Sequence, residues 1–473
     1  MGSSRRAAMR WQLSLCLGLL ALLGGTTGGS VASADAAVLK PGREHTNEPL
    51  SRASRAPTHA ALAEAHAASS LAARLAWANT WGEYREKHAA AMLRVEETGS
   101  LGTDRFLVCV FQISLGWGNR VTPIFTAAII ALLTNRVLLV RTSKEGTAWC
   151  DEVPVWDLLE PQLALKVSAP LAALLDKSPS VTTWSSFENG IERVEHVTTL
   201  NWTGTEMREE GAQVLNFIDG DYPMDLLKVN PYLAQFFGTY WPDGEVARHI
   251  WRELLRPTPM IEERVRAVME GKMAGRYVVG VQIRSKKAWP RGDGSKFVFS
   301  DFFKAAEMAA HKHGFTGDHV RFFIAGDSPE VYTEAEDYFG ADRVIRTDNG
   351  VGAEDTPLAG NPGNEASGLT DLMLLAMCDD LVLSWASSYG TLAAGISGVV
   401  PMYVWPALQE PPGGFKMQRV SRALTSEPIF ANGPWFAVFA DEGDRSRFFH
   451  HPEALRVYGS SGPPQWGNST FDM

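Results

Sequence analysis

The stretch YVVGVQIR, residues 277–284, decides the fold of this chain. It is an apolar run of strand length, which is typical of a parallel strand buried on both faces. Similar short runs follow it and alternate with segments of helical length, which predicts a doubly wound parallel sheet. The further strands are expected at residues 320–325, 343–346, 381–384 and 402–404, and the helices at 301–313, 329–339, 369–378 and 389–397.

A second α/β unit is expected nearer the N-terminus. Residues 106–113 form a continuous apolar run that predicts a buried strand, and residues 114–119 form a glycine-bearing loop. Residues 120–135 predict a helix with Pro123 in its first turn, where proline is tolerated. A strand at residues 136–141 completes a βαβ unit.

The two α/β units are separated by a stretch without clear periodicity, residues 149–240, and by helices expected over 240–272. This separation favours an α/β fold of the GT-B type, in which two Rossmann-like domains face a cleft. A TIM barrel is disfavoured because the first βαβ unit lies so far along the chain from the other strands.

The N-terminal residues resemble a targeting segment. Arg5, Arg6 and Arg10 are followed by a stretch without charge, residues 11–34. Such a stretch is either a signal peptide or a single membrane anchor, and the small residues 32–34 would also suit cleavage. Both possibilities stay open.

Residues 35–100 are rich in Ala, Arg, His and Glu, and residues 58–94 predict one or two helices with few large apolar side chains. This composition suits a stem that holds a catalytic part away from a membrane, or else an N-terminal extension without fixed structure. The domains are therefore expected as a signal or anchor at 1–34, a stem at 35–100, an N-terminal α/β domain at 101–272, a C-terminal α/β domain at 273–410, and a segment at 411–473 that packs back on both.

Composition narrows the function classes. The chain has 473 residues and a formal net charge of -10, which argues against non-specific nucleic-acid binding. Beyond Cys16 in the targeting segment there are three cysteines, Cys109, Cys150 and Cys378, which cannot all pair, and no CxxC motif suggests zinc. Asn201 and Asn468 begin glycosylation sequons.

The first candidate binding loop reads GWGNR and contains Gly116, Gly118, Asn119 and Arg120. It ends a strand and opens a helix, where backbone amides face an anionic or polyol ligand. An ordinary tight turn would have the same pattern. Arg141 stands where a nicotinamide-binding fold would place an acidic residue, so dinucleotide binding is not expected.

Three more candidate loops follow strands of the second unit. Gln282 and Arg284 end the first strand, and the arginine fork matches phosphate oxygens. Asp327 precedes a helix and would contact ribose or base, although helix capping is an equally good explanation. The fourth loop could cradle a diphosphate, or cap its helix, and contains Ser384, Ser387, Ser388, Tyr389 and Gly390.

Taken in order, these motifs resemble those of the plant xyloglucan fucosyltransferases. The resemblance rests on GWGNR at 116–120 with LTNRVL at 133–138, WCDE at 149–152, GVQIR at 280–284, DLVLS with SSYG at 380–390, and RA with SEP at 422–428. It implies GDP-fucose as donor without another cofactor, inversion at the sugar, and a single-pass Golgi membrane protein. It also implies that Arg284 contacts the donor pyrophosphate and that residues 387–390 line the donor site. The domain at 101–272 would then be the acceptor-side domain and the domain at 273–410 the GDP-sugar-binding one. Lys286 and Lys287 stand where the family often has an acidic residue.

The expected function is therefore transfer of L-fucose from GDP-fucose to a galactose hydroxyl of a cell-wall or cell-surface glycan. An N-glycan core or protein O-fucosyltransferase, and a catalytically weakened glycan-binding protein, are the alternatives. The triplet Asp219-Gly220-Asp221 could be a metal motif, but it lies outside the nucleotide-binding unit. We expect charge neutralisation by Arg284 and helix N-termini without metal, and Asp219 either as a turn residue or as the group that orients or deprotonates the acceptor.

Overall fold

The structure is a computed structural model. It describes residues 59–112, 116–144, 148–150, 154–185, 197–199, 211–218, 222, 227, 232–285, 297–347, 362–385, 387–404, 420–423 and 425–428. The expected anchor, residues 1–34, lies outside this part. Among the residues that the structure describes, no helix is both long and apolar enough to cross a bilayer.

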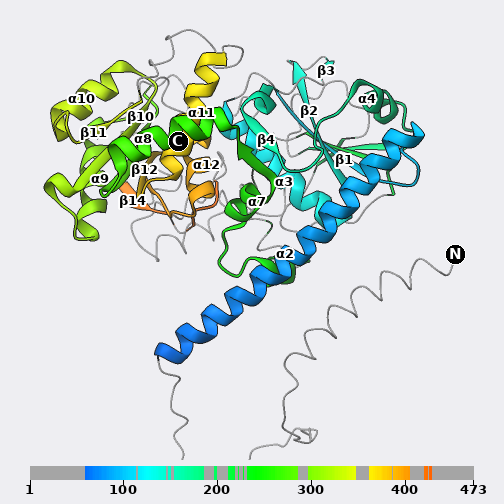
Figure 1. The fold of residues 1–473 in the computed structure, drawn as a ribbon, viewed down its shortest axis with the longest axis horizontal. Helices are drawn as coiled ribbons and strands as arrows, with labels where there is room; N and C mark the ends of the chain where they lie inside the picture. Colours follow the sequence, from blue (N-terminus) through cyan, green and yellow to red (C-terminus); the bar gives the residue numbers. More distant parts are fainter. Residues whose placement is uncertain are drawn as a thin grey trace, which may run out of the picture. The chain divides into compact units, whose positions relative to one another are not determined.

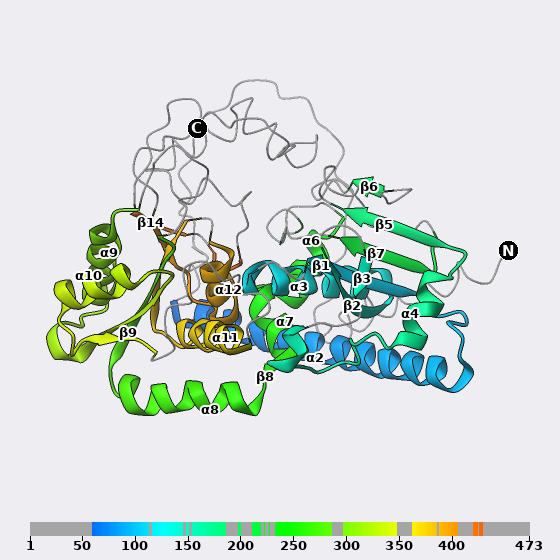
Figure 2. The ribbon, with the colours of Figure 1, turned by 90° about the horizontal axis from the view of Figure 1, so that it is seen from above.

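The first sheet has the order β3-β2-β1-β7-β5-β6 (Figures 1 and 2). All of its pairings are parallel except that of β3 with β2. Its strands are β1 Phe106–Gln112, β2 Val137–Lys144, β3 Ala148–Cys150, β5 Val181–Ser185, β6 Val197–Thr199 and β7 Val214–Ile218.

Helix α3, Trp117–Thr134, connects β1 to β2. It begins three residues earlier than the sequence predicts, so Pro123 falls in its second turn and not in its first. The helix ends at Asn135, which adopts the left-handed conformation (φ 56°) that closes many helices. The expected βαβ unit is confirmed.

The second sheet has the order β11-β10-β9-β12-β13-β14, and only β14 is antiparallel to its neighbour. Strand β9, Tyr277–Ile283, is central and has the predicted bounds. The other strands are β10 Val320–Gly326, β11 Val344–Ile345, β12 Asp380–Ser384, β13 Met402–Val404 and β14 Val420–Arg422, and the helices are α9 Phe299–Lys312, α10 Pro329–Phe339, α11 Pro362–Ala376 and α12 Ser388–Ser397.

Alternate residues of β9 face two different cores. Val279, Val281 and Ile283 pack against α9 and α10, whereas Gly280 and Gln282 face α11 and α12. Figure 2 shows these helix pairs on opposite sides of the sheet. A side chain at Gly280 would meet Leu375 and Cys378 at about van der Waals contact or closer, so glycine lets α11 approach the strand.

The two sheets share one central core. Cys109 of β1, Ile124 of α3 and Leu392 of α12 belong to the same buried cluster, whereas the outer face of β1 packs in a separate one. Helix α12 therefore packs against α3 and against α7, Val246–Leu254. The chain therefore forms two Rossmann-like units, and packed helices join these units to each other.

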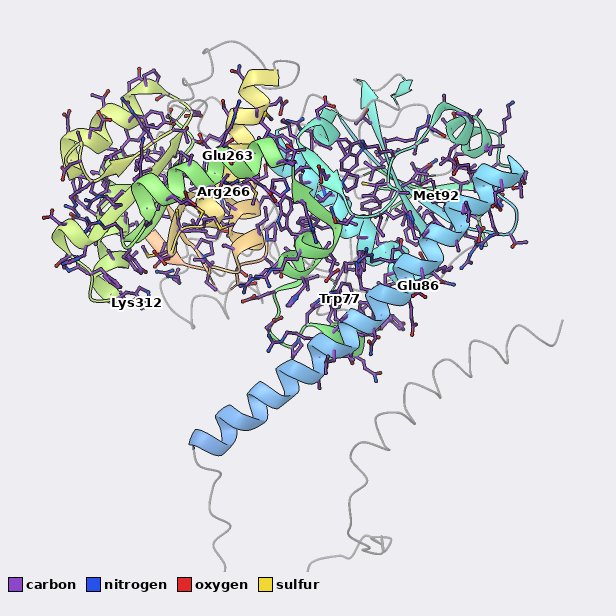
Figure 3. All side chains as sticks on the ribbon, in the orientation of Figure 1. Trp77, Glu86, Met92, Glu263, Arg266 and Lys312 are labelled. Atoms are coloured by element: carbon purple, nitrogen blue, oxygen red, sulfur yellow. The ribbon has the colours of Figure 1, made fainter. Side chains whose placement is uncertain are left out.

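The stretch from 149 to 240, expected to be irregular, carries regular structure. Besides β3, β5, β6 and β7 it contains α4 Ala169–Asp176, α6 Ala234–Tyr240, a 3-10 turn Pro154–Asp157, and β4 Leu159–Pro161, which pairs with β8 Leu255–Pro257. Downstream lie α8 Pro259–Val268, a π-helical turn Met269–Met273 and a 3-10 turn Gly317–His319. Glu263 and Arg266, labelled in Figure 3, form an exposed ion pair along α8.

Helix α2, His59–Thr98, confirms the helix expected at 58–94, within the segment predicted as a stem. Its residues Trp77, Trp81 and Tyr84 are buried in the central core. Figure 3 labels Trp77 on this helix. The Tyr84 hydroxyl donates to Arg136 O and accepts from Leu138 N, and His88 Nε2 bonds Leu138 O. These bonds satisfy backbone groups of β2 that no strand pairs, so this half of α2 is part of the folded body.

Candidate active site

The candidate site lies where the parallel strands of the second sheet end. Gln282, the penultimate residue of β9, pairs with Leu383 of β12 in the strand register. Its side chain is buried, and a Cβ at Gly390 would lie 2.7 Å from Gln282 Oε1. Oε1 has no hydrogen-bond partner among the described residues, so a buried acceptor faces the first turn of α12.

Arg284 follows β9 and presents an exposed side chain at this edge. Its backbone N donates to Ser384 Oγ at 2.9 Å, and that hydroxyl donates to Gln282 O at 3.3 Å. Ser384 is fully buried and ties β9 to β12, so its role is to hold the strand ends together. The Arg284 guanidinium bonds none of the described residues, which leaves it available to an anion.

Asp327, after β10, is engaged with the turn after β9. Its Oδ1 accepts from Ser285 N at 2.7 Å and from Ser285 Oγ at 2.6 Å. The next residue, Ser328, is the N-cap of α10 but makes no side-chain capping bond. Asp327 therefore fixes the turn that carries Arg284, and neither a ribose contact nor helix capping is needed to explain it.

The start of α12 holds the fourth predicted loop. Ser387 is the N-cap and is 1% exposed, yet its Oγ bonds none of the described residues. Tyr389 donates its hydroxyl proton to Gly368 O at 2.6 Å, and burial raises the pKa of Tyr389 well above its usual value. Tyr389 thus anchors α12 to α11, and Ser387 is left as the unpaired hydroxyl at the helix start.

The first and fourth predicted loops meet. A Cβ on Gly118 would lie 2.3 Å from the backbone carbon of Ser388, so α3 and α12 touch at their first turns. Gly116, the N-cap of α3, is exposed, and a Cβ there would meet nothing within 4 Å. Asn119 Oδ1, in the same turn, is buried without a described partner.

Arg120 is engaged in a buried ion pair. It is 1% exposed, and its Nη2 donates to both carboxylate oxygens of Glu365, at 2.9 and 2.7 Å. Contact of Arg120 with the donor stays a prediction, and what the structure shows is this pairing. The sequence could not show it, because the partner is 245 residues away along the chain.

Sequence reasoning missed Asp371, on α11 beside the ends of β10 and β11. Thr347 Oγ1, two residues after β11, donates to Asp371 Oδ1 at 2.7 Å. Burial raises the pKa of Asp371 to about 7, and the bond from Thr347 opposes this rise. The signal that could have identified it is a single acid within the apolar helical run GLTDLMLLA at 368–376.

Several predicted residues lie outside the described part of the chain: Asp219, Gly220, Asp221, Lys286, Lys287, Asn201 and Asn468. Where the structure does describe side chains, no group of three or more His, Cys, Asp or Glu could hold a metal ion. Cys109 and Cys378 are buried thiols.

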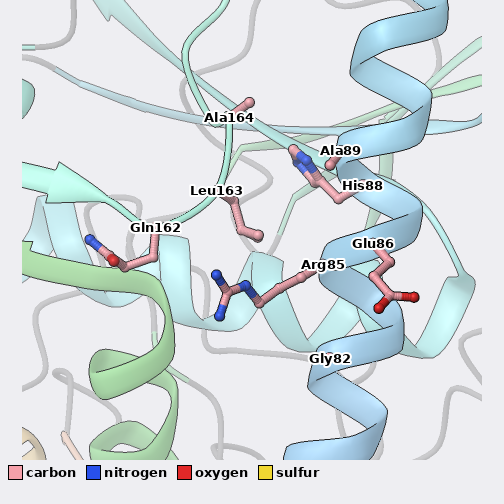
Figure 4. Close-up of a pocket in the computed structure, with 8 residues that line it drawn as sticks. All are labelled: Gly82, Arg85, Glu86, His88, Ala89, Gln162, Leu163 and Ala164. Atoms are coloured by element: carbon pink, nitrogen blue, oxygen red, sulfur yellow. The ribbon is translucent and has the colours of Figure 1, made fainter.

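A pocket of about 460 Å³ lies elsewhere, between α2 and residues 162–164 (Figure 4). Arg85 and His88 line it, and His88 contacts Leu138, the second residue of β2. The pocket is therefore beside the amino-terminal half of that strand and away from the strand ends described above.

The chain shares its fold with a solved structure of FUT1 and is less similar to two further solved structures. A mutant of Arabidopsis thaliana FUT1 in complex with GDP matches with a TM-score of 0.50 and 16% identity, over 75% of this chain and 84% of that chain. The α-1,6-fucosyltransferase NodZ soaked with GDP-fucose matches with a TM-score of 0.34 and 16% identity, over 67% of this chain and 98% of that chain. POFUT1 in complex with GDP matches with a TM-score of 0.38 and 12% identity, over 65% of this chain and 100% of that chain. No family model and no curated protein matches the sequence. The likeness to FUT1 confirms the predicted GT-B fold.

Proposed function

We propose that this protein transfers L-fucose from GDP-fucose to a galactose hydroxyl of a glycan, with inversion and without a metal. The observation that carries the proposal is the meeting of two helix starts beside an arginine that bonds none of the described residues. The first turns of α3 and α12 touch at Gly118 and Ser388, and Arg284 lies at the same strand edge. The GDP complex of FUT1, which shares the fold, supports a GDP-linked donor.

The diphosphate would be held by the Arg284 guanidinium and by the amides at the start of α12. A helix N-terminus and an arginine fork both stabilise an anion, and they do so most when charge develops on the leaving group. Ser387 Oγ, buried and without a described partner, adds a hydroxyl donor at the same place. Gln282 Oε1 and Asn119 Oδ1 would accept from sugar hydroxyls.

The base would be recognised by Asp371. Guanine presents adjacent N–H donors at N1 and N2, which a carboxylate can accept together. Asp371 is partly exposed and lies beside the ends of β10 and β11, whereas Arg284 lies at the ends of β9 and β12. This separation along the sheet edge suits a nucleoside diphosphate lying across it.

Transfer would be a single displacement. The acceptor hydroxyl loses its proton to a base, its oxygen bonds the anomeric carbon, and the bond from that carbon to the phosphate oxygen breaks, so GDP leaves with the electron pair. Asp219 stays our proposal for the base.

We also propose a Golgi location with one N-terminal span and a lumenal catalytic part. The support is the uncharged stretch at residues 11–34 behind Arg5, Arg6 and Arg10. Secretion after cleavage is the alternative, and sizing the N-terminus of the mature protein by mass spectrometry separates them.

The test is a donor panel of GDP-fucose, GDP-mannose and UDP-galactose with galactose-terminated oligosaccharides. We expect turnover with GDP-fucose alone, and slow hydrolysis of GDP-fucose when acceptor is omitted. Turnover of UDP-galactose instead would contradict the proposal, and donor binding without any turnover would indicate a glycan-binding protein on this scaffold.

A further inference from the structure

A buried ion pair joins the two α/β halves beside the candidate site. Arg120 belongs to α3, which connects strands of the first sheet, and Glu365 belongs to α11, which packs on the second. Their side chains are 1% and 9% exposed, so both charges are removed from water.

Four further contacts surround the pair. Trp117 Nε1 donates to Glu365 O at 3.2 Å, and the Arg120 guanidinium carbon lies 4.7 Å from the centroid of the Trp117 ring. A Cβ on Gly368 would lie 3.5 Å from the Trp117 ring, and Gly368 O accepts from Tyr389. The N-terminal half of α11 therefore holds the first turn of α3 and the first turn of α12 at once.

Stability alone is a poor explanation for this pair. A buried ion pair usually contributes no more than well-packed apolar residues of the same size, because both charges lose their hydration. The pair instead fixes the orientation of α3 relative to α11, because one guanidinium nitrogen must meet both carboxylate oxygens and the guanidinium must also face an indole ring.

We propose that Arg120 and Glu365 are positioning residues that set the first turn of α3 against that of α12. Resting on the proposed function, this role predicts an effect on the transfer step. The GDP part of the donor is held by groups of the second sheet and α12, so GDP affinity should not depend on the pair. Transfer also requires the first turn of α3 to be placed correctly against that of α12, so kcat should depend on the pair.

The test uses full-length protein carrying Arg120→Met together with Glu365→Met, beside each single variant. Each single change leaves a buried charge or a buried gap and should lower Tm, whereas the double variant should recover most of the loss. In the double variant we expect GDP affinity by calorimetry within threefold of wild type and kcat with GDP-fucose and galactose-terminated oligosaccharides at least tenfold lower.

Asp380→Asn is the matched control. Asp380, whose side chain is 2% exposed, pairs with the partly exposed Arg422 at the opposite edge of the second sheet, with bonds of 2.6 and 2.8 Å. This variant should lose stability but keep kcat at temperatures where it is folded.

A double variant with restored Tm and wild-type kcat would overturn the positioning role, since the pair would then only be structural. A tenfold loss of GDP affinity in that variant would also overturn it, because Arg120 would then contact the donor. Failure of wild-type protein to bind GDP is a separate result, which would contradict the proposed function itself.

Discussion

In the proposed mechanism, Arg284 is the residue that stabilises the leaving diphosphate. Replacement by Ala removes a charge-assisted fork to the leaving diphosphate and should cost at least about 2–3 kcal/mol of transition-state stabilisation. Arg284→Lys should be nearly as damaging, because an ammonium lacks the planar two-point geometry. Donor turnover measures both.

The control for Arg284 is Arg276→Ala. Arg276 is also exposed, but it precedes β9 and donates to Asp318 O at the far edge of the sheet. Turnover within threefold of wild type in Arg284→Ala would remove that residue from the site.

The proposed role of Asp371 predicts that GDP affinity depends on pH. Only the ionised carboxylate accepts two N–H donors, and with a pKa near 7 it becomes protonated as the pH falls from 8 to 6. GDP affinity should therefore fall over this range in wild type. Asp371→Asn should bind GDP at least about tenfold more weakly at pH 8, since its amide offers donors where acceptors are needed, and its affinity should be flat with pH. Calorimetric titrations at pH 6 and 8 measure this.

The stability of the protein should depend on pH in the opposite direction to GDP affinity. The pKa of Asp371 is raised above its unfolded value, so the folded state binds the proton more tightly and stability contributed by this group falls as pH rises from about 4 to about 7. The Tm of Asp371→Asn minus the Tm of wild type should therefore be larger at pH 8 than at pH 5. An unchanged difference between the two pH values would show that Asp371 is ionised in both states.

At the scale of elements, the contact between α3 and α12 is the feature that brings two distant loops together. Gly118→Ala places a methyl group 2.3 Å from backbone that cannot move independently, and overpacking of this kind costs about 1–3 kcal/mol. We expect a lower Tm and a large loss of transfer. Gly116→Ala, two residues away with open space around it, should change neither, and equal Tm values for the two variants would contradict the close contact.

The elements also show what the sequence could predict. Strands such as β9 and β10 were predicted to within a residue, because apolar runs buried on both faces leave a continuous signal. Strand β5, with the sequence VTTWS, was missed because short strands with polar residues lack that signal. The strand-end loops were found by position, but their pairings were not, since Asp327 with Ser285 and Arg120 with Glu365 depend on tertiary contacts.

At the scale of the whole molecule, α2 is expected to be essential for folding. Its side chains bond backbone groups of β2 and pack with aromatic residues at the end of α6 and just after it, with Trp77 and Trp241 at 4.7 Å between ring centroids. Trp81→Ala should destabilise the protein by about 3–5 kcal/mol in chemical denaturation, because it empties a fully buried site. Leu75→Ala, on the same helix but 58% exposed, is the control and should be close to neutral. Equal midpoints for the two would restore the view of this segment as a stem.

The account as a whole depends on a guanosine diphosphate binding at the strand ends of the second sheet. The most direct measurement is a calorimetric titration of the wild-type protein with GDP and with UDP, in excess chelator and then with added manganese. We predict that GDP binds in chelator, that UDP binds at least about tenfold more weakly because its base lacks the paired donors that Asp371 would accept, and that manganese changes neither. Absence of GDP binding, or binding only after manganese is added, would contradict the account.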